Sequence, residues 1–268
     1  MKTQEHGWLR PYLLAGDKQF CVGRWDWWLS VDGIPEGPIP QIKFVEPTDD
    51  TNEVESALKL GRLTANTAYQ HVRGLLDEIG PSWGALRHFL EWLGWGLGIH
   101  DKRGTDDPWD VDDVLFRKFQ LGRLQAARAD VLGRLLSENL GKGWNPGAFY
   151  PTPQNVVNMM VELTMHDVGP DRKEVSVCDP CVGTGRMLLA ASNYSVNLHG
   201  QDIDPLCVLA CKINAMLFMP WLVAPKVQTP APLAKEVSKV RVEQGHPPIP
   251  KKHRVTKQGQ LCLFEETE

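Results

Sequence analysis

The sequence lacks the features that would mark a membrane or secreted protein. Its 268 residues contain no uninterrupted apolar run near the length of about eighteen that a membrane helix needs, and the start, Met1 to His6, has no apolar core of a signal peptide. A net charge of −4 gives no whole-chain signature of nucleic-acid binding. With 42% hydrophobic and 23% charged residues, the composition is that of an ordinary globular protein. We therefore expect a cytoplasmic protein with a buried core.

Cysteine is scarce, and its spacing allows two interpretations. Four of the six cysteines form the pairs Cys178-x-x-Cys181 and Cys207-x-x-x-Cys211, a spacing similar to that of a zinc site. However, the first pair flanks a predicted strand end and turn, and the second lies at i and i+4 on an apolar helix, where free cysteine is commonly buried. We favour free thiols over zinc, and a reducing cytosol also disfavours a disulfide.

The most informative stretch is residues 175–205, VSVCDPCVGTGRMLLAASNYSVNLHGQDIDP. A β-rich run, Val175–Cys178, leads to Asp179 and the turn Gly183-Thr184-Gly185; a helix-forming run follows, and a second short strand ends at Asp202. This order is typical of one unit of an open α/β sheet whose first turn faces a ligand. Glycines let the backbone approach that ligand closely, and an acid after the second strand can accept hydrogen bonds from a ribose diol. The stretch predicts a site for a nucleoside-containing cofactor.

The region before this stretch divides into two segments by composition. Residues 1–50 are rich in turn formers and tryptophan, which predicts an irregular or hairpin-like segment. Its tryptophan cluster either anchors a small core or stacks on bases: Trp25, Trp27 and Trp28. Residues 51–143 have helical spacing and predict a helical subdomain, with helices from Asn52 to about Ile79, Ser82 to about Leu97 and Asp107 to about Gly141. Basic residues lie along the last predicted helix, and we interpret them as a solvated face, with a DNA-backbone contact as the alternative: Arg117, Lys118, Arg123, Arg128 and Arg134.

The remaining segments are a core, residues 144–224, and a tail, residues 225–268. In the core, Thr152 is predicted to cap a helix that has Pro153 in its first turn and buries one stripe: Val156, Val157, Met160 and Leu163. A further helix is expected from Leu206 to Met219, closed by Pro220. The tail is basic and rich in proline, which predicts a disordered linker.

Three motifs stand in order in residues 144–224. They are Phe149-Tyr150-Pro151-Thr152-Pro153 before an apolar helix, Asp179-Pro180-Cys181-Val182-Gly183-Thr184-Gly185, and Gly200-Gln201-Asp202-Ile203-Asp204-Pro205. In order and spacing they resemble the adenine-specific DNA methyltransferases related to the modification subunits of type I restriction-modification systems. The resemblance implies an α/β fold with a Rossmann-like, S-adenosylmethionine-dependent methyltransferase core, truncated or minimal, preceded by a helical N-terminal region.

The resemblance also implies a set of cofactor-binding residues. These residues would surround the methionine and adenine side of the cofactor, its amino-acid end and its ribose: Phe149, Tyr150, Thr152, Pro153, Asp179, Pro180, Gly183, Thr184, Gly185, Asp202 and Ile203. Pro151 is inserted relative to the family's Phe-Tyr-Thr-Pro run, which leaves open which aromatic ring contacts the cofactor.

The family's catalytic tetrapeptide, Asn or Asp followed by Pro-Pro and an aromatic residue, is missing. In the family it accepts hydrogen bonds from the exocyclic amine of a flipped adenine and stacks on the base. The single Pro-Pro of this chain follows a histidine and precedes an isoleucine, so the catalytic candidates are His246, Pro247 and Pro248.

The end of the chain carries a second resemblance. Gln260-Leu261-Cys262-Leu263-Phe264 is similar to the short peptide by which bacterial replication and repair proteins bind the sliding clamp, in which Gln260, Leu261, Leu263 and Phe264 would make the contacts. The alternative is that the apolar side chains dock on the chain's own surface.

Three functions remain open. The first is a DNA adenine methyltransferase that transfers a methyl group from S-adenosylmethionine to the exocyclic amine of adenine. The second is a non-catalytic S-adenosylmethionine-binding relative or partner subunit that acts as a DNA- or clamp-binding module, with another subunit supplying catalytic or recognition elements. A nicotinamide-dependent oxidoreductase fits the glycine turn and acid but not the aromatic-Thr-Pro loop.

Overall fold

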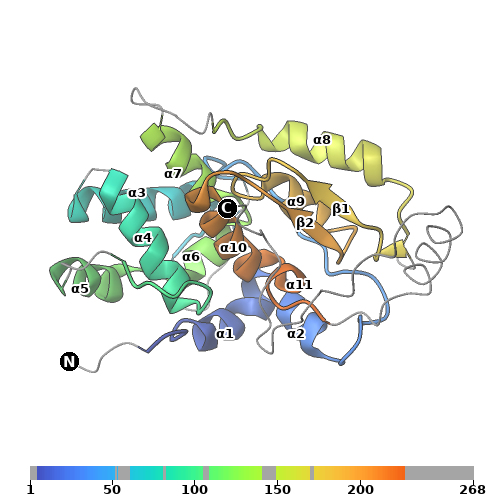
Figure 1. The fold of residues 1–268 in the computed structure, drawn as a ribbon, viewed down its shortest axis with the longest axis horizontal. Helices are drawn as coiled ribbons and strands as arrows, with labels where there is room; N and C mark the ends of the chain where they lie inside the picture. Colours follow the sequence, from blue (N-terminus) through green and yellow to red (C-terminus); the bar gives the residue numbers. More distant parts are fainter. Residues whose placement is uncertain are drawn as a thin grey trace, which may run out of the picture.

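The computed structural model describes residues 5–51, 53, 61–80, 83–104, 109–140, 149–169 and 172–226. A helical group comprises α1 (Arg10–Phe20), α3 (Ala65–Ile79), α4 (Trp83–Gly96), α5 (Trp109–Lys118), α6 (Leu121–Ala127) and α7 (Val131–Leu140). The second group consists of a small sheet and the helices around it, in the order α2 (Arg24–Leu29), α8 (Gln154–Met165), β1 (Val177–Asp179), α9 (Arg186–Ala191), β2 (Leu198–Gly200) and α11 (Pro220–Val223). The apolar α10 (Pro205–Phe218) lies between the two groups and packs against α4, α7 and α9 (Figure 1).

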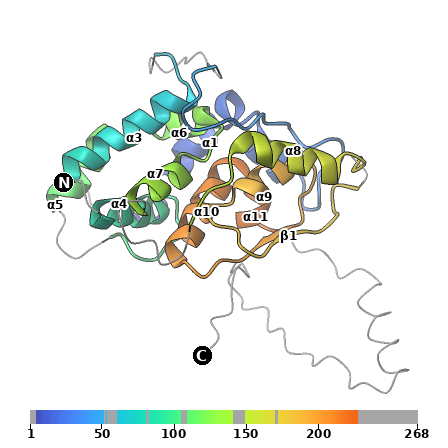
Figure 2. The ribbon, with the colours of Figure 1, turned by 90° about the horizontal axis from the view of Figure 1, so that it is seen from above.

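The two strands and α9 form the parallel unit that the sequence predicts. Val177 pairs with Leu198 and Asp179 with Gly200, and α9 packs on both strands. The strand–turn–helix–strand order is therefore confirmed, in a helix-rich structure whose described residues form a sheet of two strands. Because β1 pairs only with β2 within those residues, its other side is open. Figure 2 shows α8, α9 and β1 in one part of the molecule, away from α3 and α5.

The N-terminal segment contains two helices, so the prediction of an irregular or hairpin-like structure was wrong for residues 10–29. Its tryptophans determine where α2 packs. Trp25 and Trp28 are buried, and their indole N–H groups donate to the carbonyls of Met216 and Ala224, each at 2.8 Å. These two rings are therefore core anchors and are closed to stacking on bases.

Arg24 joins this segment to the sheet region. The side chain is fully buried, and its guanidinium donates to the carbonyls of Pro40 and Phe218 at 2.8 Å each. It also donates to Ser192 Oγ at 2.7 Å and to Asn193 Oδ1 at 2.5 Å, beyond the end of α9. A buried charge of this kind is tolerated because its donors are paired. Arg24 and the buried side chains of Ile39, Ile42, Phe44 and Val45 therefore belong to the core.

The single helix predicted from Asp107 to about Gly141 is three helices, α5, α6 and α7. Arg128 ends α6 in the left-handed region, at φ +47°. Asp130 then caps α7, since its Oδ1 accepts from the Gly133 amide at 2.9 Å. The basic residues thus lie on different helices. Three of them form ion pairs with acids: Arg117 with Asp113, Lys118 with Glu78, and Arg134 with Glu138. This pairing fits the interpretation of solvated charged residues.

Helix α8 begins at Gln154, and Thr152 does not cap it as predicted. Instead the Gln154 amide donates to the carboxylate of Glu46, which comes from the N-terminal segment. The buried positions are Gln154, Val157, Val161 and Met165, on the face that packs against α9. Met160 and Leu163, predicted to be buried, are 44% and 76% exposed.

No helix in the described ranges is long and apolar enough to cross a membrane.

Candidate functional site

Two acids mark the ends of the paired strands. Asp179 is the last residue of β1, and Asp202 follows β2 by two residues. The Asp202 carboxylate accepts from the Gly183 amide at 2.8 Å through one oxygen and from the Asp204 amide at 2.9 Å through the other. The acid after the second strand is therefore bonded directly to the glycine turn after the first.

The two acids also interact electrostatically. Burial raises the pKa of the half-buried Asp179 above its ordinary value, and the charge of Asp202 raises that pKa further. The Cys181 amide, which donates to Asp179 Oδ1 at 3.1 Å, acts in the opposite direction. A ligand that brings positive charge or hydrogen-bond donors to this place would stabilise the ionised pair.

The glycines of the turn are required by the backbone and by their neighbours. Gly183 has φ +53° and Gly185 has φ +89°, a region that L-residues rarely adopt. A Cβ on Gly183 would lie 2.7 Å from Phe149 Cε2, and one on Gly185 would lie 2.7 Å from Cys211 Sγ. Phe149, from the aromatic-Thr-Pro loop, therefore lies directly against the turn.

The structure brings several of the predicted residues together and separates one. Phe149, Asp179, Gly183 and Asp202 meet at the turn, whereas Thr184 is 1% exposed and its hydroxyl faces the interior. Two large side chains next in sequence to this group are open to solvent: Tyr150 is 79% exposed and Ile203 is 89% exposed. Thr152, Pro153 and Pro180 are exposed as well. Thr184 thus lies inside the protein, with its backbone as well as its side chain closed to solvent.

Sequence reasoning missed a buried polar cluster beneath the turn. Asp130, 0% exposed, accepts from the Thr184 hydroxyl at 2.6 Å and from Arg186 Nε at 3.2 Å through Oδ2. Its Oδ1 accepts from Asn214 Nδ2 at 2.8 Å, in addition to the α7 amide described above. The signal in the sequence is a lone acid inside the apolar run Ala129-Asp130-Val131-Leu132, because an acid is rarely buried unless it is paired.

Arg186 extends this cluster to the aromatic-Thr-Pro loop. Its Nη1 donates to the Thr152 carbonyl at 2.8 Å and lies 3.5 Å from Glu46 Oε2. Glu46 in turn accepts from the Gln154 amide, as noted for α8. The loop and the glycine turn are therefore held by one connected set of charges, in which Asp130 and Arg186 are buried and Glu46 is partly exposed; no sequence motif points to Glu46.

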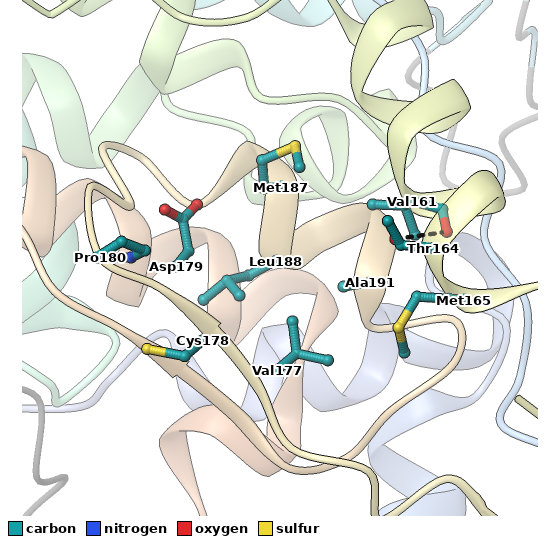
Figure 3. A pocket seen from close by; sticks show the side chains of 10 residues that line it. All are labelled: Val161, Thr164, Met165, Val177, Cys178, Asp179, Pro180, Met187, Leu188 and Ala191. Carbon is teal, nitrogen blue, oxygen red and sulfur yellow. Dashed lines mark hydrogen bonds between the residues drawn. The ribbon is translucent and has the colours of Figure 1, made fainter.

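A cavity of about 280 Å³ lies beside β1, and no β2 residue lines it. Figure 3 shows Asp179 and Pro180 at one end and the α8 residues Val161, Thr164 and Met165 at the other. It shares only Asp179 and Pro180 with the predicted cofactor residues, so it is a neighbour of the turn and not the cradle that the turn forms.

The cysteine pairs do not converge. Cys178 and Cys181 are exposed, whereas Cys207 and Cys211 are buried in α10. The described residues contain no group of three or more His, Cys, Asp or Glu side chains that could hold a metal ion. The catalytic candidates His246, Pro247 and Pro248 and the terminal peptide with Gln260, Leu261, Leu263 and Phe264 lie outside the described residues.

This geometry defines a class of site: a glycine turn and two acids at the ends of adjacent parallel strands, of the kind that binds a nucleoside-containing ligand. Comparison with known families adds a particular resemblance. Residues 129–219, about a third of the chain, match the model of the N-6 DNA methylase family. The matched segment contains β1, β2, the turn, and the four buried residues Asp130, Thr184, Arg186 and Asn214. A search of curated proteins gave no match. The similarity supports DNA N6-adenine methylation as the general chemistry to which this segment is related.

Proposed function

We propose that this chain binds S-adenosylmethionine at the glycine turn and acts in the methylation of adenine in DNA. The observation that carries the proposal is the hydrogen bond from the Gly183 amide to Asp202, inside the segment that is similar to N-6 DNA methylases. This bond joins the two strand ends into one cradle, in the place where the sequence resemblance puts the cofactor.

The residues present fit that cofactor. Gly183 and Gly185 give the turn its compact shape, because a Cβ on either would collide with Phe149 or Cys211. Asp202 has lone pairs left for a ribose diol, since each of its oxygens accepts one amide bond. S-adenosylmethionine supplies an electrophilic methyl group on a positively charged sulfonium and also carries an ammonium group. Asp179 and Asp202 would stabilise these charges.

The same charges argue against a nicotinamide dinucleotide. Its pyrophosphate is an anion and would lie beside the carboxylate of Asp179, whose pKa is raised by burial and, to a smaller extent, by repulsion from the charge of Asp202. A second anionic group at this place would increase that repulsion. An oxidoreductase is therefore the least favoured of the three functions.

One observation favours the alternative, in which the chain is a cofactor-binding subunit that another polypeptide completes. The side of β1 away from β2 is unpaired in the described residues, and the cavity beside it is lined by residues of β1, α8 and α9. An unpaired strand edge is a template for a further strand. Under this alternative the partner supplies the recognition of the base, and the purified chain binds cofactor without transferring methyl groups.

The experiment combines calorimetry with methyl-labelled S-adenosylmethionine and transfer of the label to adenine-containing DNA. Asp202→Asn places an amide NH₂ against the N–H of Gly183 or Asp204, so we expect at least about tenfold weaker cofactor binding. Asp204→Asn is the matched control. Asp204 caps α10 by accepting from the Leu206 amide at 2.8 Å, and asparagine caps a helix equally well, so binding should be unchanged.

Three outcomes are informative. Label in DNA that depends on Asp202 supports the methyltransferase. Cofactor binding without transfer supports the subunit, and no binding by the unchanged chain refutes both.

We further propose that the terminal peptide binds a bacterial sliding clamp, on the basis of its sequence alone. Replacing both Leu263 and Phe264 by alanine should abolish retention of the chain on immobilised clamp. Retention that survives this double substitution would refute the proposal.

A further inference from the structure

We infer that Asp130 is a positioning residue for the cofactor cradle: from the N-terminus of α7 it holds the glycine turn and, through Arg186, the aromatic-Thr-Pro loop in their binding geometry. The inference rests on the proposed binding of S-adenosylmethionine at this turn. Asp130 belongs to the helical group, and no other residue of that group is predicted to contact the cofactor.

The first step is the saturation of the Asp130 carboxylate. Its two oxygens accept from four donors, namely the Gly133 amide, Asn214 Nδ2, the Thr184 hydroxyl and Arg186 Nε, at 2.6–3.2 Å. All of these lie in the interior, where an unpaired carboxylate or guanidinium is costly. Thr184 and Arg186 therefore cannot move away from α7 without leaving buried charge unpaired.

The second step is the position of these partners in the cradle. Thr184 lies between the two positive-φ glycines, and Asn214 of α10 also donates to the Thr184 carbonyl at 2.9 Å. The middle residue of the turn is thus held at both its hydroxyl and its carbonyl. This leaves the neighbouring Gly183 amide aimed at Asp202, the contact on which the proposed site depends.

The third step is the link to the second half of the cradle. Arg186 bonds Asp130 through Nε and the Thr152 carbonyl through Nη1. Rotation of the guanidinium away from Asp130 would also withdraw its bond from the Thr152 carbonyl and so release the aromatic-Thr-Pro loop. Tight packing supports the same reading, because a Cβ on Gly133 would lie 2.0 Å from Asp130 Oδ2 and 2.5 Å from Thr184 Oγ1. Only glycine at 133 lets the turn approach α7 this closely.

The test compares Asp130→Asn with Asp112→Asn. Asp112 is a similarly buried carboxylate on α5, bonded to His88 at 2.8 Å and to Arg103 at 2.6 Å, in the helical group away from β1 (Figure 1). Both substitutions should lower Tm. At a temperature where each variant is folded, only Asp130→Asn should weaken S-adenosylmethionine binding, by about tenfold or more, and speed amide hydrogen exchange over residues 179–185 in the cofactor-free protein.

A conservative pair separates the hydroxyl from folding defects. Thr184→Val keeps the shape and removes the donor to Asp130, whereas Thr184→Ser keeps the donor. Valine should behave as Asp130→Asn does in both binding and exchange, and serine should restore both. Affinity and exchange equal to those of the unchanged protein in folded Asp130→Asn and Thr184→Val would overturn the inference alone. Absence of binding by the unchanged protein would overturn the proposed function and, with it, this inference.

Discussion

Gly185→Ala is expected to be one of the most destabilising small substitutions in the chain. Gly185 has φ +89°, where an L-residue costs roughly 1–2 kcal/mol. The added Cβ would also lie 2.7 Å from Cys211 Sγ on buried α10, and overpacking of this kind costs roughly 1–3 kcal/mol. Burial raises the pKa of Cys211 to about 12, so the group in the way is a neutral, buried thiol. The sum is a loss of about 2–5 kcal/mol, or on the order of 5–15 °C in Tm.

A second substitution separates the two causes. In Cys211→Ala the sulfur is gone, and the nearest atom to a Cβ at position 185 becomes the Cys211 Cβ, at 3.6 Å, an ordinary contact. The cost of Gly185→Ala in that background should fall to the backbone part, roughly 1–2 kcal/mol. Urea unfolding of the four proteins of this cycle measures the coupling. Gly74→Ala on α3, where a Cβ meets nothing within 4 Å, is the control and should stabilise by about 0.5–1 kcal/mol.

Two results would contradict this reasoning. A cost for Gly185→Ala that is the same with and without the Cys211 sulfur would show that the thiol contact is not its source. An unchanged unfolding midpoint for Gly185→Ala would show that the turn tolerates the side chain and that its backbone is not held in the left-handed region.

Two further predictions concern pH. Because the pKa of Asp179 is raised in the folded state, ionisation of this carboxyl opposes folding, and stability is lost as pH rises through that pKa. Asp179→Asn should therefore raise Tm at neutral pH, and the gain in Tm should disappear on acidification. The same substitution should weaken cofactor binding. Burial, aided by the charge of Arg123, lowers the pKa of His71 to about 4, and its Nε2 accepts from the Gln120 amide at 3.1 Å, so its contribution to stability should be lost as pH falls from about 6.5 through 4. His71→Gln should flatten the urea midpoint over that range, and an equally steep curve would contradict the assignment.

Local patterns were sufficient to predict the parts of the fold that depend on local structure. The glycine turn between two short strands is such a case, because Gly183 and Gly185 supply positive φ values whatever surrounds them. The helix closed by Pro220 is another, since α10 begins after the capping side chain of Asp204 and ends at Phe218. In both, the residues that determine the structure are adjacent in sequence.

The errors have a common cause in contacts between distant residues. The helix expected across residues 107–141 is broken at Arg128, two residues before Asp130, whose partners Thr184 and Arg186 are more than fifty positions further along the chain. Helix α8 receives its N-terminal acceptor from Glu46, and not from the adjacent threonine. Neither contact leaves a local motif, so neither boundary was predictable from spacing.

The candidate site divides along the same line. The residues expected to bind the cofactor were predicted from three motifs, and hydrogen bonds of Asp130, Arg186 and Asp202 connect the turn among them to the rest of the described structure. For recognition of a base the sequence lacks the family's tetrapeptide, and within the described residues β1, which carries Asp179, pairs with no strand along the side next to the cavity. A segment that pairs with this strand edge would satisfy its unpaired N–H and C=O groups. The same segment would remove the apolar surface of the adjoining cavity from water, which also stabilises the protein. An element that recognises the base would therefore be best held here, because pairing with β1 would bring its end beside Asp179 and the glycine turn.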